Sequence, residues 1–168
     1  CSMLLLATVI SAAFAAGNTA NIPKGEVVSR DIFTAGQSVN NDGTIKGDLF
    51  AAANNINSDG TVEGDLICAA KDIGMAGKVL GDMRSASQTV NISGSVGKNL
   101  NVFAQSVNIK DTSLIGGNAY AFCERIEING KIKGYLHVNS GNIILNGEIF
   151  GDVEINNDVS DEVDESHE

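Results

Sequence analysis

Apolar and polar residues alternate along short stretches of the chain, and these stretches return every 17 residues. Val90-Asn91-Ile92 is typical, with apolar side chains two residues apart. Such alternation predicts strands with one buried face. The apolar positions are rich in Ile and Val, which favour strands, whereas Gly and Asn lie between the stretches and favour turns. We therefore expect an all-β domain over residues 26–157.

The repeat is clearest in a glycine-containing motif. Residues 43–49 (GTIKGDL) return as residues 60–66 (GTVEGDL), 77–83 (GKVLGDM) and 147–153 (GEIFGDV). Counted from the last residue of this motif, further apolar residues follow at offsets of 7, 9 and 13, with polar exceptions at Asn41 and Ser58 in the offset-9 column. The register holds through eight copies, with one two-residue insertion at Asp111 and Thr112. A short fixed period of this kind is the signature of a solenoid.

The predicted fold is a right-handed parallel β-helix, a β-solenoid of triangular section with about eight coils of 17 residues. Each coil should contain about three short strands separated by corners. One coil buries too little apolar surface to offset the entropy of ordering it, so stability must come from stacking. A hexapeptide β-helix does not fit the apolar offsets, and leucine-rich repeats have a longer period of 20–29 residues.

The two ends differ from the repeats. Residues 1–16 contain an apolar run that ends in Ala13-Phe14-Ala15, a pattern typical of a signal peptide cleavage site. We interpret them as the truncated remnant of a signal peptide, and residues 17–25 as a short linker. The alternative is an uncleaved anchor that holds the chain on the cytoplasmic face of a membrane. Residues 158–168 carry six acidic residues and no Lys or Arg, which predicts a disordered tail.

Few residues offer chemistry. The chain has two histidines, His137 and His167, and no phosphate-binding or nucleophile motif, so we predict no enzyme and no cofactor. The sequence has no basic patch with interleaved aromatic residues, so we do not expect nucleic acid as a partner. Cys68 and Cys123 lie three coils apart, beyond disulfide reach, and should be small core residues.

One column of acidic residues is a candidate cation site. Residues at equivalent positions of successive coils form a column, and this one contains Asp48, Asp65, Asp82 and Asp152. Carboxylates one coil apart could bind Ca²⁺. Capping of the corner by bonds to backbone amides is the simpler interpretation, so we predict no metal site.

Exposed apolar residues and the ends of the rod suggest contacts with other molecules. A lateral contact is expected at Phe33, Phe50, Ile67, Phe103 and Phe122, which point outward in two groups. The terminal coils have no substantial cap, so their backbone and half-exposed core should template another chain. The residues expected at these polymerisation ends are Val28, Ile32 and Val39 at one end, and Ile143, Leu145, Ile149 and Val153 at the other.

The recurring pattern G-x-[IV]-x-G-[DN]-[LM], with V-x-I seven to nine residues later, resembles the bactofilins. The resemblance covers residues 26–155. It implies a right-handed triangular β-helix that polymerises end to end without nucleotide and has no catalytic residues. Bactofilins are polymer-forming cytoskeletal proteins that scaffold cell-wall enzymes or shape the envelope. Their members are typically cytoplasmic, whereas this chain begins with an export-like segment.

Together these features predict a non-enzymatic, self-assembling structural protein that forms filaments in the bacterial cell envelope or outside the cell. Its main partner would be further copies of itself, with cell-wall or envelope components as additional partners. A membrane would be contacted only through the N-terminal apolar segment, if that segment is uncleaved. The competing hypothesis is an exported glycan-binding or adhesin-like solenoid module.

Overall fold

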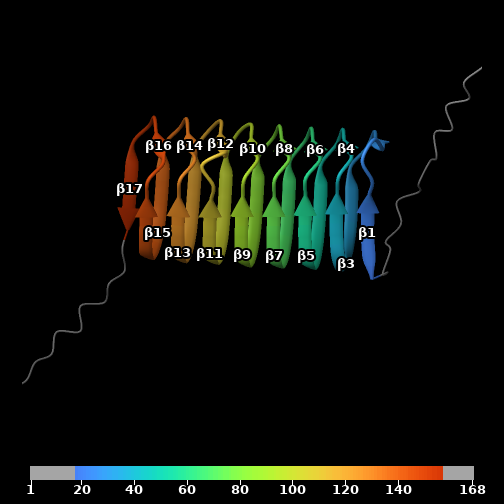
Figure 1. Cartoon of the computed structure of the whole chain (residues 1–168), viewed down its shortest axis with the longest axis horizontal. Coiled ribbons are helices and arrows are strands. Elements are labelled where there is room, and N and C mark those ends of the chain that lie inside the picture. Colours follow the sequence, from blue (N-terminus) through green and yellow to red (C-terminus); the bar gives the residue numbers. More distant parts are fainter. Residues whose placement is uncertain (1–17, 157–168) are drawn as a thin grey trace, which may run out of the picture.

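A computed structural model describes residues 18–156 and shows a straight rod made only of strands and turns (Figure 1). The expected signal peptide remnant (1–16) and acidic tail (158–168) lie outside these residues. Strands of successive coils pair in parallel throughout, which confirms a β-solenoid of about eight turns. The strands stack along the long axis, with β1 at one end and β17 at the other.

Each coil contains one ten-residue strand and one two-residue strand, rather than three short strands of similar length. The long strands are β3 (Ile32–Asn41), β5 (Leu49–Ser58), β7 (Leu66–Met75), β9 (Met83–Ile92), β11 (Leu100–Ile109), β13 (Ala119–Ile128) and β15 (Leu136–Leu145). With β1 (Thr19–Ile22) and β17 (Val153–Asn156) they form a nine-stranded sheet. The short strands form an eight-stranded sheet, and they are β2 (Val27–Val28), β4 (Thr44–Ile45), β6 (Thr61–Val62), β8 (Lys78–Val79), β10 (Ser95–Val96), β12 (Leu114–Ile115), β14 (Lys131–Ile132) and β16 (Glu148–Ile149).

The long strand bends at its sixth residue. In β5 the first and third residues are buried, and so are the eighth and tenth, so the inward alternation changes phase between them. Asn54 lies at the change, is exposed and has no register partner in β7. Because a flat strand keeps one phase, the two halves of the long strand must form two sides of the coil. The short strand closes the third side.

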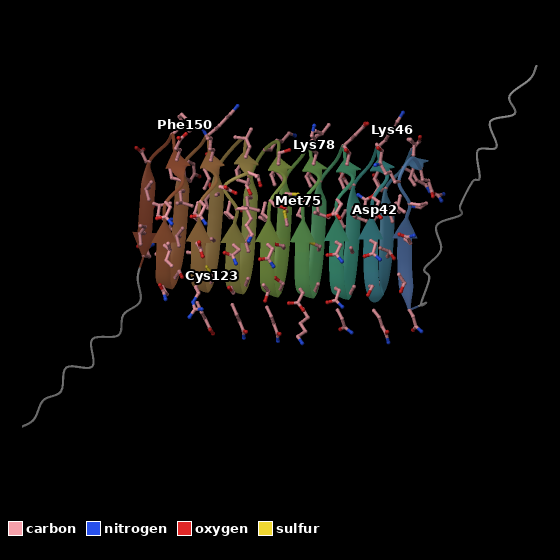
Figure 2. The ribbon with its side chains drawn as sticks, viewed as in Figure 1. Asp42, Lys46, Met75, Lys78, Cys123 and Phe150 are labelled. Carbon is pink, nitrogen blue, oxygen red and sulfur yellow. The ribbon has the colours of Figure 1, made fainter. Side chains whose placement is uncertain are left out.

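The core is a set of aliphatic columns along the rod. Isoleucine, leucine and valine from every interior coil are 0–1% exposed, and Met75 and Met83 fill the same columns. Figure 2 shows Met75 inside the rod, whereas Lys46, Lys78 and Phe150 project from its edge. A buried polar pair interrupts one column, where Asn41 Nδ2 donates to Ser58 Oγ over 3.2 Å.

Part of the expected linker is instead strand β1. Ala20 and Ile22 pair in register with Val39 and Asn41 of β3, an offset of 19 rather than 17 residues. The same offset separates Ile109 from Ile128, where the chain carries its two-residue insertion. The repeat therefore begins before residue 26, and the extra residues in the turn conceal it from a search at a period of 17.

Candidate assembly interface

The C-terminal tip is the layer formed by the second half of β15, β16 and β17. It ends the core without a neighbour: Leu145 is 38% exposed and Val153 is 43% exposed, whereas Ile128, one coil before Leu145, is fully buried. Ile143 and Ile149 are partly buried and pack against the core from the same layer. All four residues expected at this polymerisation end therefore lie at the open end of the rod.

The N-terminal tip is the layer formed by β1, β2 and the first half of β3. Val28 and Ile32 are partly buried in this layer, as expected for an end. The expectation for Val39 is wrong, because Ala20 of β1 covers it and it is fully buried. Ala20 and Ile22 take its place at the tip, and sequence reasoning missed both because they fell in the expected linker.

The two tips present the same set of columns. Leu145 continues the column of Ile22, Ile149 that of Val28, and Val153 that of Ile32, as the strand registers show. The two tips also fit together along the path of the coil. β17 pairs with the first half of β15 and ends there, and β1 pairs with the second half of β3. The described chain therefore stops at nearly the position in the coil at which it starts. A copy of the N-terminal tip therefore has the apolar pattern that an additional coil would place on the C-terminal tip.

The column of acidic residues forms a ladder of side-chain to backbone hydrogen bonds. Asp48 Oδ1 accepts from Asp65 N–H over 2.7 Å, Asp65 Oδ1 accepts from Asp82 N–H over 2.8 Å, and Asp31 begins the series by accepting from Asp48 N–H. Asn99 and Asn118 continue it as far as the N–H of Tyr135. The expected corner capping is present, although each oxygen binds the amide of the next coil rather than one in its own.

The ladder bonds occupy one oxygen, Oδ1, of Asp31, Asp48 and Asp65. Residues 18–156 contain no group of three or more His, Cys, Asp or Glu side chains placed to hold a metal ion. Arg84 also binds this column, with Nη2 2.9 Å from Asp82 Oδ2 and Nη1 3.2 Å from Asp65 Oδ2. The hydrogen bond from Asn99 N–H is the main cause that holds the pKa of Asp82 below its usual value, with smaller contributions from Asn99 Nδ2 and Arg84.

The ladder has a direction and runs from Asp31 at the N-terminal tip to the N–H of Tyr135, one coil before Asp152. Each side chain accepts from the coil that follows it in the sequence, so Asp152 would be the next acceptor beyond the C-terminal tip. At the other tip no hydrogen bond joins Asp31 N–H to another of residues 18–156. One tip thus offers a carboxylate in the position where the other tip offers an amide.

A second surface lies on the first half of the long strands, where the residues expected in a lateral contact gather. Phe33, Phe50 and Ile67 follow one another in an outward column, and the Phe33 and Phe50 rings stack with centroids 4.5 Å apart. Beside them runs an outward column of alanines: Ala35, Ala52, Ala69 and Ala86. Together they line an open apolar groove of about 890 Å³ that Phe103 closes at one end.

The second aromatic group continues along the same face. The Phe103 and Phe122 rings stack with centroids 5.0 Å apart, and Tyr120 contacts Tyr135 edge to face at 5.3 Å. Phe33, Phe103 and Phe122 are exposed, whereas Phe50 and Ile67 are half-buried by their neighbours in the column. All five residues expected in the lateral contact thus share one face of the rod.

The remaining candidate chemistry is isolated. His137 Nδ1 lies 3.2 Å from Glu154 Oε2 at the C-terminal end. Cys68 and Cys123 are both free thiols, and burial raises the pKa of Cys68 to about 12. Within the described part of the chain, no helix has the length and apolar character needed to cross a membrane.

Comparisons with known proteins identify no relative for this fold and these surfaces. The chain matches no protein-family model, no curated protein and no solved structure.

Proposed function

We propose that the chain is a non-enzymatic structural protein that assembles into filaments by end-to-end stacking of its solenoids. The observation that carries this proposal is the match between the two tips. Among residues 18–156, each tip leaves backbone groups and aliphatic side chains without a neighbour, and unpaired strands of this kind recruit other chains. A contact between unlike surfaces does not close on itself, so it produces an open filament.

Head-to-tail stacking would continue the apolar columns and the parallel strand pairing of the interior coils across the joint. Leu145 would pack on Ile22 of the next copy, and Val153 on Ile32. β15, β16 and β17 would pair in parallel with β1, β2 and β3 of that copy. Asp152 would accept from Asp31 N–H, extending the side-chain ladder across the joint. A joint between like tips would instead pair the strands antiparallel and bring two Asp152 carboxylates together at the C-terminal tip.

Glu26 at the N-terminal tip occupies a place that glycine takes in most coils, and the interior of the rod shows how such a residue is accommodated. Gly43, Gly60 and Gly77 leave no room for a side chain, because a Cβ there would meet the coil before. In one interior coil Ser113 replaces this glycine, after a turn in which its N–H donates to Lys110 O over 3.0 Å. Glu26 follows the same kind of turn, closed by its bond to Pro23 O over 3.0 Å.

The turn ending at Ser113 nevertheless stacks on a regular coil. Leu114 N–H donates to Gly94 O of the preceding coil over 3.3 Å, and Thr112 Oγ1 donates to Ser93 O over 2.8 Å. A coil that carries a side chain in place of this glycine can therefore stack on its neighbour when a longer turn precedes it. This precedent supports a coil stacked on β2.

The location we propose is the bacterial envelope, because the N-terminal apolar segment resembles a signal peptide. The repeat motif's resemblance to bactofilins supports polymer formation in the same way, as a resemblance. Sequencing the N-terminus of protein secreted by a bacterial host tests the location. A mature chain that begins just after Ala15 or Ala16 supports export, and an intact N-terminus in the cytoplasm contradicts it.

Substituting one residue at the C-terminal tip tests the assembly itself. Leu145→Asp places a charge in the column that would be buried at the joint, so filaments visible by negative-stain electron microscopy should disappear. Ile144→Asp is the matched control, because Ile144 is the neighbouring residue on β15, is 42% exposed and points away from the core. Filaments of Leu145→Asp as long as those of the control would contradict docking through this tip. Wild-type monomers that bind glycans would favour the adhesin-like alternative.

A further inference from the structure

The exposed face that carries Phe33 and Phe103 has an uneven profile in almost every coil. The second and fourth residues of each long strand point outward here. In the first three coils the second residue is large and the fourth is alanine, as in Phe50 and Ala52. In the coil of β11 the order reverses, since Asn101 comes second and Phe103 fourth. The face therefore has a ridge beside a trough, and the two exchange sides along the rod.

We infer that this face pairs with the same face of a second copy, with the two rods side by side and pointing in the same direction. The inference rests on the proposed function, since it describes how filaments built from these rods associate. The geometry selects the arrangement. A two-fold axis parallel to the rods, midway between the two columns, places the ridge of one copy in the trough of the other. A two-fold axis along the strands would place ridge against ridge.

The reversal of the profile supports the same register. In the parallel arrangement each coil faces its own equivalent, so Phe33 lies against Ala35 and Phe103 against Asn101. A large residue meets a smaller one in the first group and at Phe103, on either side of the reversal. Phe122 would meet Tyr120, an aromatic pair of the kind that already stacks within each rod. An antiparallel arrangement would lose this coil-by-coil match.

The charged residue at the centre of the face does not oppose pairing. Arg84 lies between the two aromatic groups, and both Asp65 and Asp82 of its own chain bind its guanidinium. Across the seam Arg84 would meet Ala86, which adds no like charge. The seam therefore contains no unpaired cation.

The area suits pairing of filaments better than pairing of single molecules. Six coils of about 4.8 Å and five residues of about 3.3 Å give a face of roughly 470 Å² per copy. The total of roughly 900 Å² is below the size of most stable interfaces. In a filament the contact repeats along the whole length, so the weak contacts add up through multivalency. Single rods should pair only at high protein concentration, whereas filaments should associate in pairs.

Ala52→Glu tests the inference, because Ala52 is exposed in the trough and its substitution leaves the core untouched. We expect wild-type filaments to be paired and Ala52→Glu filaments to be single, with about half the width and the same axial repeat. Asn55→Glu is the matched control, since Asn55 is exposed on the same strand beyond the bend. It adds the same charge and should leave the filaments paired. Paired Ala52→Glu filaments would overturn the inference and leave end-to-end assembly standing.

Cross-linking tests the direction of the pair and keeps the two proposals distinguishable. In protein with Cys1, Cys68 and Cys123 replaced, Ala35→Cys should join to itself through a short bismaleimide, since parallel rods place the two copies of residue 35 on facing coils. If the cysteine at position 35 cross-links only to a second cysteine placed near the C-terminal end of the rod, the two rods are antiparallel and the inference is overturned. If the wild type forms no filaments at all, sedimentation at high concentration decides: a dimer lost in Ala52→Glu but kept in Asn55→Glu supports the face, and a monomer in both rejects it.

Discussion

Replacing Gly77 by alanine should unfold the coil around it, although the change adds only one methyl group. Gly77 lies at the corner before β8, directly on Gly60 of the preceding coil. A Cβ at this position would overlap the Gly60 carbonyl oxygen and lie 2.6 Å from the Asp59 carbonyl carbon. Both obstacles are backbone atoms, so no side-chain rotation relieves the overlap, and the two coils must separate locally.

The cost follows from the hydrogen bonds at this corner. Lys78 N–H donates to Gly60 O over 2.9 Å, and Gly77 N–H donates to Ser58 O over 3.0 Å. Separating the coils breaks both, and each hydrogen bond at this half-buried corner contributes about 0.5–1.5 kcal/mol. We therefore expect a loss of about 1–3 kcal/mol in the free energy of unfolding, from the two bonds together. Domains have only about 5–15 kcal/mol in total, so the effect should be large.

Gly74, three residues earlier, provides the control. It points outward in β7, and a Cβ there would meet only the Asn57 Oδ1 atom at 3.0 Å, which belongs to an exposed side chain held by one long bond to Asn40 Oδ1 (3.3 Å). Because glycine within a strand is less favourable than alanine by about 0.5–1 kcal/mol, Gly74→Ala should be neutral or slightly stabilising.

Urea unfolding monitored by circular dichroism compares the two variants. The measurement is best made in a Leu145→Asp background, in which assembly does not contribute to stability. Gly77→Ala should unfold at a much lower urea concentration than its parent, and Gly74→Ala at the same or a higher one. Equal midpoints for the two alanine variants would refute the close backbone stacking on which this reasoning depends.

Three further predictions concern single side chains. Asp82→Ala should destabilise the rod by about 1–3 kcal/mol because it leaves Asn99 N–H without an acceptor, whereas Asp82→Asn, which keeps the acceptor, should cost less; urea titration measures both. The hydrogen bond from Asn99 lowers the pKa of Asp82. The contribution of ionised Asp82 to the free energy of unfolding is therefore complete above about pH 4 and declines as the pH falls through the lowered pKa. Acid titration should find this dependence of stability on pH reduced in Asp82→Asn. Ser85→Ala should raise stability by about 1 kcal/mol because the buried Ser85 Oγ has no hydrogen-bond partner among residues 18–156, and an unchanged or lower midpoint would contradict this. Burial raises the pKa of Cys68 to about 12, whereas the pKa of Cys123 is raised by burial and lowered again in part by a hydrogen bond with Ser140. In a Cys1→Ser background at pH 8, a thiol reagent should therefore label Cys123 before Cys68. Labelling in the opposite order would show that the rod opens near β7.

The fold was accessible from the sequence because every coil repeats the same physical requirement. Each inward column must be apolar along the whole rod, so the positions of Ile45, Val62 and Val79 in the sequence directly predict a buried column, and all three are at most 1% exposed. The glycines of the corners carry similar information. They are required where a Cβ would meet the coil before, and this requirement also recurs once per coil.

The first layer was harder to predict for a physical reason. Pro23, Lys24 and Gly25 form a turn longer than the usual corner, so β1 falls out of the 17-residue register. Gly25 has a positive φ of 88° in this turn, a conformation that favours glycine. The two-residue insertion at Asp111 and Thr112 was visible in the sequence and gives the same offset. Applying that offset a second time would have found Ala20 and Ile22.

The single long strand per coil was also missed. The expectation of about three short strands per coil placed a break inside each long strand. The chain bends there without ending the strand, because the residues on both sides keep their parallel partners in the next coil. The ridge and trough on the face formed by the first half of the long strands depend on which outward columns lie side by side, and the repeat alone does not give this.

The most direct test of the central claim is a disulfide between unlike tips. Two single-cysteine variants, Ile22→Cys and Leu145→Cys, are prepared without the native cysteines and mixed under oxidising conditions. Adjacent parallel strands lie about 4.8 Å apart, within the Cα separation that a disulfide accepts. Head-to-tail stacking predicts a covalent dimer in the mixture and none from either variant alone. A dimer from one variant alone would reveal contacts between like tips, and the absence of any dimer while the rods remain folded would contradict end-to-end assembly.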